Sequence, residues 1–520
     1  MNKYEKKDEW VNKLRTIFEK NKNRVYMINS SNGKEYTFGE IEEFSLKFSS
    51  LLSSHGIKKQ DKVAILLPNC VEFVLAYFSC MQLGAIPVPI NTKLVQKDIQ
   101  YILSNSEAKL ILKDKSASEL LTNIPILYLI INHTLPENNP EKSSSFLIEL
   151  QKLEKFSNTS FNNVYDDDSI VIIYTSGTTN LPKGVEFSYE NMISNALTFI
   201  DMVKLESNHR FYEILSLAYM AGFYNLMLVP FLGGASMVID KAFDFSIALN
   251  FWKKIMKYNI NALWLVPSIA SMLLSLEYPE DEITFSKSGK VNLIFCGTAP
   301  LSESLAQKFE DQFSLKLHNT YGLSELLFIS ANYPGIVIPK GVGKILPGCK
   351  ISILDSDSNC LPFGKEGEIA IESEYVMKGY HHFNENKTDQ SFDLNLFLTG
   401  DIGYINEGFL YITDRKKDII IRGGINISPA EIEEVIRKHP LVEEVAVVGI
   451  PDELKGEQII AVIDSSSSLL ETEVLNHCRN FLAPFKVPEA VVFMSPFPRS
   501  VTGKIQKGKI KELILGEKAF

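Results

Sequence analysis

The fold of this chain is decided by the stretch Tyr174-Thr175-Ser176-Gly177-Thr178-Thr179-Asn180-Leu181-Pro182-Lys183-Gly184-Val185. An apolar run, Ser169 to Tyr174, leads into it and a second β-prone run, Val185 to Phe187, leads out, so two strands joined by a loop are expected. The loop offers hydroxyls, backbone amides and the ammonium of Lys183, which are the donors that a chain of phosphates needs. It is not a Walker A loop, because that motif has glycine before the lysine and Ser or Thr after it. The alternative for the loop alone is a plain surface turn, which its Gly, Thr, Asn and Pro residues all suit.

Outward from this loop, short apolar runs alternate with helical patterns between residues 60 and 330. The runs Lys62 to Leu67, Leu110 to Leu112 and Ile126 to Ile131 are typical of buried strands. Ala85 to Ile90 suits an edge strand, because its two prolines cannot donate to a ladder. Cys70 to Leu83 has the pattern of an amphipathic helix. Apolar strands separated by helices predict sheets covered on both faces, so the expected fold class is α/β.

The C-terminal hundred residues form a separate pattern. Ser428-Pro429-Ala430-Glu431 is a capping box with proline at the first helical position, so a helix should begin here and end before Pro440. The strand-like Val442 to Ile450 and the helix-like Glu473 to Leu482 follow. A dense charge cluster at residues 414 to 418 precedes them, so we expect a large body over residues 1–414 and a small α+β domain over residues 415–520.

Composition excludes several classes of protein. The 520 residues are 45% hydrophobic and 22% charged, as in soluble globular proteins, and their net charge of -10 argues against a nucleic-acid partner. Six scattered cysteines and a charged N-terminus without an apolar core predict a cytoplasmic protein. The uncharged run Ile214 to Ile239 is long enough to cross a membrane, but Asn225, Pro230 and a Gly-Gly pair interrupt it. We therefore expect a buried helix and a strand there, and no transmembrane segment.

Further motifs follow in order along the chain. They are Cys296-Gly297-Thr298-Ala299-Pro300-Leu301, Tyr321-Gly322-Leu323-Ser324-Glu325, Thr399-Gly400-Asp401, Asp414-Arg415 and Pro498-Arg499-Ser500-Val501-Thr502-Gly503-Lys504. Tyr321 offers an aromatic face for a base, Gly297 permits close approach of the backbone, and Glu325 is a hard oxygen ligand suited to magnesium. Two of these residues have a simpler explanation when taken alone. Tyr321 could be a core tyrosine beside a turn, and Lys504 could be a solvated charge in a basic tail.

With these motifs the chain resembles the adenylate-forming superfamily, which contains acyl-CoA synthetases, nonribosomal-peptide adenylation domains and firefly luciferase. The resemblance extends from about residue 15 to residue 512. Asn180 stands where the family usually has glycine, but asparagine tolerates a left-handed backbone. The resemblance implies a large N-terminal domain of stacked α/β sheets plus a distorted β-barrel, and a small mobile C-terminal domain that swings about a hinge at Lys417.

The resemblance also implies roles for individual residues. Lys504, Lys183 and Glu325 would be catalytic, with Lys504 driving adenylation, and Thr175 and Glu325 would hold Mg²⁺. Asp401 would accept the ribose hydroxyls. A pantetheine arm would enter past Gly423 and Gly424. The implied ATP- or AMP-binding residues are Thr175, Ser176, Gly177, Thr178, Thr179, Lys183, Thr298, Ala299, Pro300, Thr320, Tyr321, Gly322, Ser324, Asp401 and Arg415.

The acyl pocket is expected at the start of the uncharged run. Tyr219 stands where family members often have a histidine gate, which puts the role of that gate in doubt. The run contains no carboxylate, and burying an unpaired ammonium group costs several kcal/mol, so an amino acid is a poor substrate. A fatty or aromatic carboxylic acid fits better. The expected lining residues, for which simple core packing is the alternative, are Tyr219, Met220, Phe223 and Leu323.

These expectations combine into an ATP-dependent acid–thiol ligase. A carboxylic acid and ATP would give an acyl-adenylate and pyrophosphate, and coenzyme A would then take the acyl group and release AMP. Three alternatives stay open: transfer to the phosphopantetheine of an acyl carrier protein, luciferase-like oxygenation, and a non-catalytic nucleotide-binding regulator. A regulator would be expected to have lost some of Lys183, Glu325, Asp401, Arg415 and Lys504. A monomer or homodimer is expected.

Overall fold

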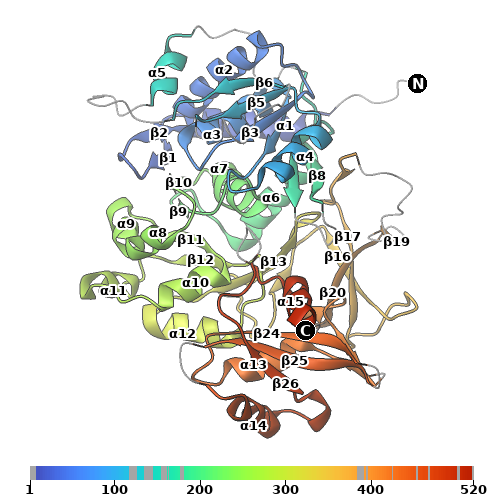
Figure 1. Cartoon of the computed structure of the whole chain (residues 1–520). Helices are drawn as coiled ribbons and strands as arrows, with labels where there is room; N and C mark the ends of the chain where they lie inside the picture. Colours follow the sequence, from blue (N-terminus) through green and yellow to red (C-terminus); the bar gives the residue numbers. More distant parts are fainter. Residues whose placement is uncertain are drawn as a thin grey trace.

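The computed structural model describes residues 7–115, 126–133, 144–153, 161, 163–175, 181–382, 392–393, 396–423, 425–452, 455–465, 469–499 and 504–517. A large body contains most of the helices and three sheets, and a small domain with its own sheet lies at one end of it (Figure 1). The mixed α/β architecture with a smaller C-terminal unit agrees with the predicted fold class.

The largest sheet of the described residues has 14 strands, of which one group is mainly parallel and the other antiparallel. Its parallel part consists of β1 (Val25–Asn29), β10 (Ser236–Ile239), β9 (Arg210–Glu213), β11 (Ala262–Leu265), β12 (Leu293–Cys296) and β13 (His318–Leu323), with β2 (Glu35–Thr37) antiparallel to β1 at the edge. The antiparallel part consists of β14 (Leu327–Ala331), β15 (Lys344–Ile345), β21 (Phe409–Arg415), β20 (Leu396–Asn406), β17 (Gly367–Ser373) and β16 (Cys349–Leu354), with β19 (Phe392–Asp393) beside β20. Tyr321 lies on β13, where these two parts meet, and Asp401 and Arg415 lie on β20 and β21 of the antiparallel part.

A second, all-parallel sheet contains the predicted apolar strands near the N-terminus, but the strand predicted at Ile126 to Ile131 is mostly exposed and not buried as expected, because it lies at the edge of the sheet. Its order is β4 (Ile86–Pro89), β3 (Lys62–Leu66), β5 (Leu110–Lys113) and β6 (Leu127–Ile130). The proline-containing β4 is an edge strand, as its missing N–H groups require. The helices of this region are α1 (Glu9–Asn21), α2 (Phe38–Ser54), α3 (Val71–Leu83), α4 (Gln96–Ser106) and α5 (Ser145–Gln151).

Helix α3 corrects one expectation. Its bounds agree with the predicted helix, but every residue from Val71 to Gln82 is buried, so it has no solvent-facing side. A helix that is buried all round belongs in the core between layers, not on the surface. Polar residues such as Glu72, Ser79 and Gln82 interrupt its apolar pattern and make it look amphipathic in the sequence.

The phosphate-loop region forms the predicted pair of strands. β7 (Ser169–Thr175) and β8 (Lys183–Ser188) are antiparallel, with Thr175 opposite Lys183. A short strand from far along the chain, β18 (Gly379–Tyr380), pairs with the other edge of β8. Helix α6 (Tyr189–Val203) follows, and its N-cap Ser188 accepts a hydrogen bond from the backbone N–H of Asn191.

The uncharged run is a buried helix followed by a strand, as expected. The helix begins as a π-helix over Ala221–Leu228 and continues as α7 (Val229–Leu232) before β10. No helix in the described part of the chain is long and apolar enough to cross a membrane. The other helices of the body are α8 (Phe245–Leu249), α9 (Phe251–Tyr258), α10 (Pro267–Leu274), α11 (Glu280–Ser286) and α12 (Glu303–Phe313).

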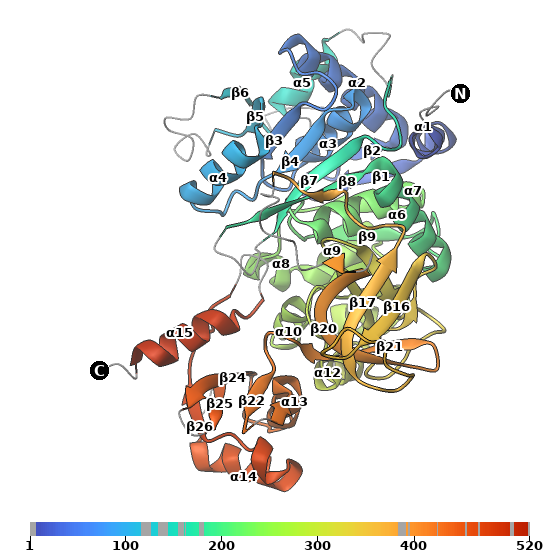
Figure 2. The same ribbon diagram turned by 90° about the vertical axis from the view of Figure 1, so that its right-hand side faces the viewer.

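The small domain packs around cores of its own, separate from that of the body, and Figure 2 shows it below the body. Its sheet has the order β23 (Ile425–Ile427), β22 (Ile420–Arg422), β25 (Gly456–Asp464) and β24 (Glu444–Asp452), with β26 (Ala490–Phe493) paired to β25. Its helices are α13 (Pro429–Arg437), α14 (Glu471–Phe481), the 3₁₀ turn Pro484–Lys486 and α15 (Lys507–Glu517). The division of the chain at residues 414 and 415 itself stays a prediction.

The predicted capping box at α13 forms only in half. The Ser428 hydroxyl accepts from the N–H of Glu431 at 3.3 Å, as expected. The Glu431 carboxylate, however, does not return to the N-cap; it binds the ammonium of Lys486 at 2.6 Å. A carboxylate of the body caps another N–H of this helix instead, because Asp414 on β21 accepts from the N–H of Ala430 at 3.3 Å and from the Ser428 hydroxyl at 2.6 Å. This carboxylate therefore joins the two units next to the predicted hinge.

Candidate active site

Three predicted nucleotide-binding residues meet from three strands of one sheet, of which β20 and β21 are neighbours. Asp401 on β20 lies opposite Arg415 on β21, and its Oδ1 is 3.0 Å from the Arg415 Nε. Its Oδ2 accepts a hydrogen bond from the Tyr321 hydroxyl on β13 at 2.6 Å. The Asp401 side chain is only 4% exposed, so the guanidinium and phenol offset the cost of burying its charge. Burial, followed by the Asp401 charge, raises the pKa of Tyr321 well above its ordinary value, so this phenol stays a donor.

The loop after β12 comes close to the same place. A Cβ atom at Gly297 would lie 2.4 Å from the Thr320 Oγ1, so only glycine fits between β12 and β13 here. Thr298 adopts a left-handed backbone, with φ of 69°, and both it and Pro300 are exposed, while Ala299 is half-buried. The loop thus offers backbone groups to a ligand next to Tyr321. Two more predicted residues follow Tyr321: Gly322 is exposed at a bulge and Ser324 is half-buried.

One tyrosine, Tyr380, contacts two predicted site residues of opposite charge, Glu325 and Lys183. The Tyr380 hydroxyl donates to Glu325 Oε1 at 2.8 Å, and the Lys183 Nζ lies 4.4 Å from the centre of the Tyr380 ring. This distance is within the range of a cation–π interaction. Sequence reasoning missed Tyr380, because its neighbours form no motif and its place is set by the pairing of β18 with β8.

Lys504 belongs to the small domain but lies within electrostatic reach of the body. It is exposed by surface area, yet protein atoms crowd its amine closely enough to lower its pKa to about 8. Loss of hydration is the largest cause and the charge of Arg415 is the next, while Asp401 and Glu325 act in the opposite direction. The structure therefore places the charge of Lys504 within electrostatic reach of residues predicted to bind the nucleotide.

Two other predicted residues near the domain junction, Lys417 and Gly423, have open space around them. Lys417 is exposed in the turn after β21. Gly423 follows β22 with φ of 58°, and no atom lies within 4 Å of a Cβ built on it. Gly424 and the loop residues Ser176, Gly177, Thr178 and Thr179 lie outside the described residues, so their predicted roles are untested. The hinge and the pantetheine entrance both stay predictions.

The four predicted acyl-pocket residues differ in their surroundings. Phe223 is fully buried and stacks on Tyr77 with ring centroids 4.1 Å apart, so packing alone accounts for its position. Tyr219, Met220 and Leu323 are each partly exposed. Burial raises the pKa of Tyr219 to about 12, so its hydroxyl is a proton donor at any ordinary pH. These three side chains are the better candidates for contact with an acyl group.

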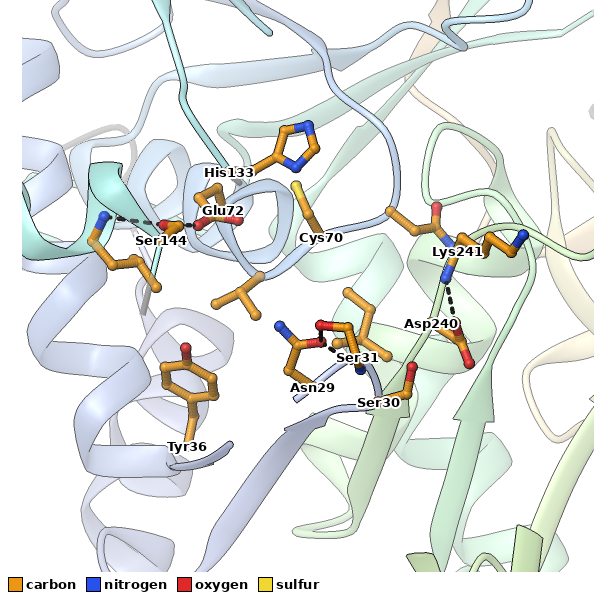
Figure 3. Close-up of a pocket in the computed structure, with 14 residues that line it drawn as sticks. Asn29, Ser30, Ser31, Tyr36, Cys70, Glu72, His133, Ser144, Asp240 and Lys241 are labelled. Carbon is orange, nitrogen blue, oxygen red and sulfur yellow. Dashed lines mark hydrogen bonds between the residues drawn. The ribbon is translucent and has the colours of Figure 1, made fainter. Parts of the chain in front are cut away.

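A polar cavity of about 260 Å³ lies apart from these residues (Figure 3). None of the predicted site residues lines it; its walls include Asn29, Tyr36, Cys70, Glu72, His133 and Asp240. Asn69, another lining residue, donates to the carbonyl of Leu215 at 2.7 Å and accepts from the N–H of Leu217 at 3.0 Å. The cavity thus lies behind the segment that leads to Tyr219, and sequence reasoning did not foresee this anchoring role of Asn69.

The donor set around Glu325 fits a magnesium ion that is held mainly by its substrate. No group of three or more His, Cys, Asp or Glu side chains suited to a metal occurs among the described residues. Magnesium is commonly bound through one or two carboxylates together with substrate phosphates, so a dedicated cage is not required. Glu325 would supply the carboxylate, and Thr175, at the end of β7, would supply a hydroxyl.

Comparison with known proteins agrees with this arrangement of motifs. The family model described as AMP-binding enzyme matches residues 14–381, and the model described as AMP-binding enzyme C-terminal domain matches residues 431–504. The chain belongs to the AMP-binding enzyme family. This AMP-binding enzyme is 30% identical over 488 residues to the long-chain-fatty-acid–CoA ligase FadD13 of Mycobacterium tuberculosis, with 92% of each chain covered.

Two further relatives support the same assignment. The AMP-binding enzyme is 30% identical to the 2-succinylbenzoate–CoA ligase of Bacillus licheniformis, over 91% of this chain and 94% of the relative. It also resembles the crystal structure of ATP-bound MatB from Rhodopseudomonas palustris, with a TM-score of 0.86, 26% identity, and 96% and 98% of the two chains covered. The predicted superfamily and the predicted class of AMP-forming acyl-CoA synthetase are confirmed. The roles of single residues stay predictions.

Proposed function

We propose that this protein is an ATP-dependent ligase that activates a fatty or aromatic carboxylic acid as an acyl-adenylate and transfers the acyl group to coenzyme A. The observation that carries the proposal is the contact of Asp401 with both Arg415 and Tyr321, with the charge of Lys504, from the small domain, within electrostatic reach of Arg415, Asp401 and Glu325. Cations and carboxylates that meet at a domain junction suit a reaction between two anionic substrates.

Nucleotide binding is assigned to the body. Asp401 would accept hydrogen bonds from the ribose hydroxyls while Arg415, which is half-exposed, keeps N–H donors available for the same sugar or the α-phosphate. The loop from Gly297 to Pro300 would contact the adenine through its backbone. Lys183 would neutralise the outer phosphates. Magnesium, held by Glu325 and Thr175, would supply further neutralisation of the phosphate chain.

In the first half-reaction a carboxylate oxygen attacks the α-phosphorus and pyrophosphate leaves. The Lys504 ammonium would lie between the two anions, where charge accumulates as they approach. A pKa of about 8 leaves this amine mostly protonated at neutral pH, so the required cation is present.

In the second half-reaction the thiol sulfur attacks the acyl carbon and AMP leaves with the carboxyl oxygen that bridged to phosphorus. A swing of the small domain about Lys417 would remove Lys504 and bring the segment at Gly423 and Gly424 to the site. The open space around Gly423 supports passage of a thin pantetheine arm.

A fatty or aryl acid is favoured by the surroundings of Tyr219. The segment from Ile214 to Ile239 carries no charge that could pair with an ammonium group, and Met220 and Leu323 present apolar surface. The names of the similar proteins include a long-chain fatty acid and 2-succinylbenzoate, so the panel of acids to test should span both classes.

The test is acid-dependent release of pyrophosphate from ATP and magnesium by the purified protein, measured over a panel of fatty and aryl acids. Free coenzyme A and a holo acyl carrier protein are then compared as acceptors. Thioester formation with free coenzyme A supports the proposal, while transfer to the carrier protein alone would reassign the acceptor. Absence of acid-dependent pyrophosphate release across the panel would refute the proposed substrate class.

A further inference from the structure

A short segment, Lys378 to His381, attaches to the strand that carries Lys183. The N–H of Lys378 donates to the carbonyl of Glu186 at 2.8 Å, and the N–H of His381 donates to the carbonyl of Gly184 at 2.7 Å. Between these two contacts lies Tyr380, opposite Val185 on β8. The position of Tyr380 is therefore fixed relative to the phosphate-loop hairpin, although the two lie far apart in the sequence.

Side chains fix the same segment on both sides of Tyr380. His381 Nδ1 is 2.9 Å from Glu186 Oε2, and the Lys378 ammonium donates to the Ser169 hydroxyl at 3.1 Å and to the carbonyl of Asp167 at 2.9 Å. Burial opposes ionisation of Glu186, but hydrogen bonds from His381 and Ser169 outweigh it and hold the pKa of this carboxyl below its usual range. The segment thus has charged as well as backbone attachments to the hairpin.

Glu325 is attached twice to this stretch of chain, once at Met377, just before the segment, and once at Tyr380 within it. Its backbone carbonyl accepts from the N–H of Met377 at 2.9 Å, and its carboxylate accepts from the Tyr380 hydroxyl at 2.8 Å. The ammonium of Lys183 lies over the ring of the same tyrosine, 4.4 Å from its centre. One aromatic side chain therefore contacts both the cation and the anion of the candidate phosphate and metal site.

We propose that Tyr380 is a positioning residue that keeps the Lys183 ammonium and the Glu325 carboxylate apart and aimed at a magnesium–triphosphate ligand. Opposite charges that contact the same side chain would attract each other into a direct ion pair if that side chain did not lie between them. Such a pair would neutralise the cation that the phosphates need and occupy the carboxylate that the metal needs. The ring face holds the ammonium and the hydroxyl holds one carboxylate oxygen, so each charge has a partner that a ligand can replace or share.

The inference rests on the proposed function, because it assigns these charges to ATP and magnesium. Two substitutions separate the two contacts. Tyr380→Phe keeps the ring under Lys183 and removes the hydroxyl from Glu325, whereas Tyr380→Leu removes both. Tyr375→Phe is the matched control: Tyr375 lies on the same stretch of chain, but its hydroxyl donates to the carbonyl of Pro347 at 2.7 Å, away from both charges.

The measurement is ATP binding by isothermal titration calorimetry without any acid substrate, once with magnesium and once with EDTA. For Tyr380→Phe we expect the affinity for ATP in EDTA to be unchanged. The factor by which magnesium increases that affinity should fall about tenfold, as expected when a hydrogen bond to a charged group is removed. Tyr380→Leu should weaken binding under both conditions. The magnesium concentration for half-maximal pyrophosphate release should rise in parallel for Tyr380→Phe, while Tyr375→Phe changes neither quantity.

The proposal is wrong if Tyr380→Phe keeps the wild-type response to magnesium within twofold, or if Tyr375→Phe changes that response equally. Should Tyr380→Leu fail to fold, the comparison of the two Phe variants still decides. Failure of the proposed function is a different result, since the wild-type protein would then bind ATP without releasing pyrophosphate in response to any acid.

Discussion

Raising the pH should switch off adenylate formation by removing the proton from Lys504. Crowding by protein, with added repulsion from Arg415, lowers the pKa of this amine from 10.5 to about 8. In the proposed mechanism the reaction needs the ammonium, so activity should be present below this pKa and be lost as the pH rises through it. With a pKa of about 8, roughly nine amines in ten are protonated at pH 7 and about one in ten at pH 9. The rate of adenylation should therefore fall about tenfold over this interval.

The assay is release of pyrophosphate at subsaturating ATP, magnesium and acid, from about pH 6.5 to about pH 10, because the rate under these conditions reports the pKa values of the free enzyme. Lys504→Arg provides the comparison, since a guanidinium stays charged throughout this range. Its rate is expected to be lower but nearly independent of pH. Lys417→Gln removes a smaller repulsion on Lys504, so the midpoint of the wild-type profile should move to higher pH.

Two results would refute this reasoning. If Lys504→Arg loses activity over the same pH interval as the wild-type protein, some other group is responsible for the profile. If the wild-type midpoint lies near 10.5, the ordinary value for lysine, the junction between the domains does not dehydrate the amine in solution.

Three further predictions test the geometry of the site. Asp401→Asn leaves Arg415 without its buried partner and weakens the acceptors for ribose, so the affinity for AMP measured by calorimetry should fall about 10- to 100-fold. In Gly297→Ala the new methyl group would lie 2.4 Å from the Thr320 hydroxyl, so the free energy of unfolding should drop by about 1 to 3 kcal/mol in denaturant titrations, and no drop would mean that β12 and β13 separate easily. Ser428→Ala removes the N-cap of α13 and its bond to Asp414, so hydrogen exchange of the α13 amides should accelerate about fivefold, as for loss of about 1 kcal/mol, while amides of α6 keep their rates.

Local sequence patterns predicted the strands and helices well where a single period dominates. The apolar runs at Lys62 and Ser169 became strands, and the proline-rich run at Ile86 became an edge strand. Sequence patterns did not predict burial correctly where other parts of the body cover an element from more than one side. Helix α3 is buried on all sides because the body surrounds it, and the polar residues along it conceal that burial.

The candidate site could be predicted only as a set of separate motifs. Their order along the chain and the residue types gave the resemblance, but neither gives the register that sets Asp401 beside Arg415. Tyr380 and Asn69 escaped notice for the same reason, since their importance lies in partners more than fifty residues away. The contribution of Asp414 to the N-terminal cap of α13 could not be predicted either, because this residue lies on a strand of the body.

Among the residues that the structure describes, the chain passes from the body to the small domain once, between Arg415 at the end of β21 and Ile420 at the start of β22. This single tether turns an encounter between two units into an intramolecular event. For a short linker the effective local concentration is on the order of millimolar, far above that of a protein in a cell. Lys504 therefore does not need strong contacts with the body in order to be present when ATP and acid are bound. In the proposed two-step reaction, weak docking of this kind would allow the small domain to leave quickly between the two half-reactions.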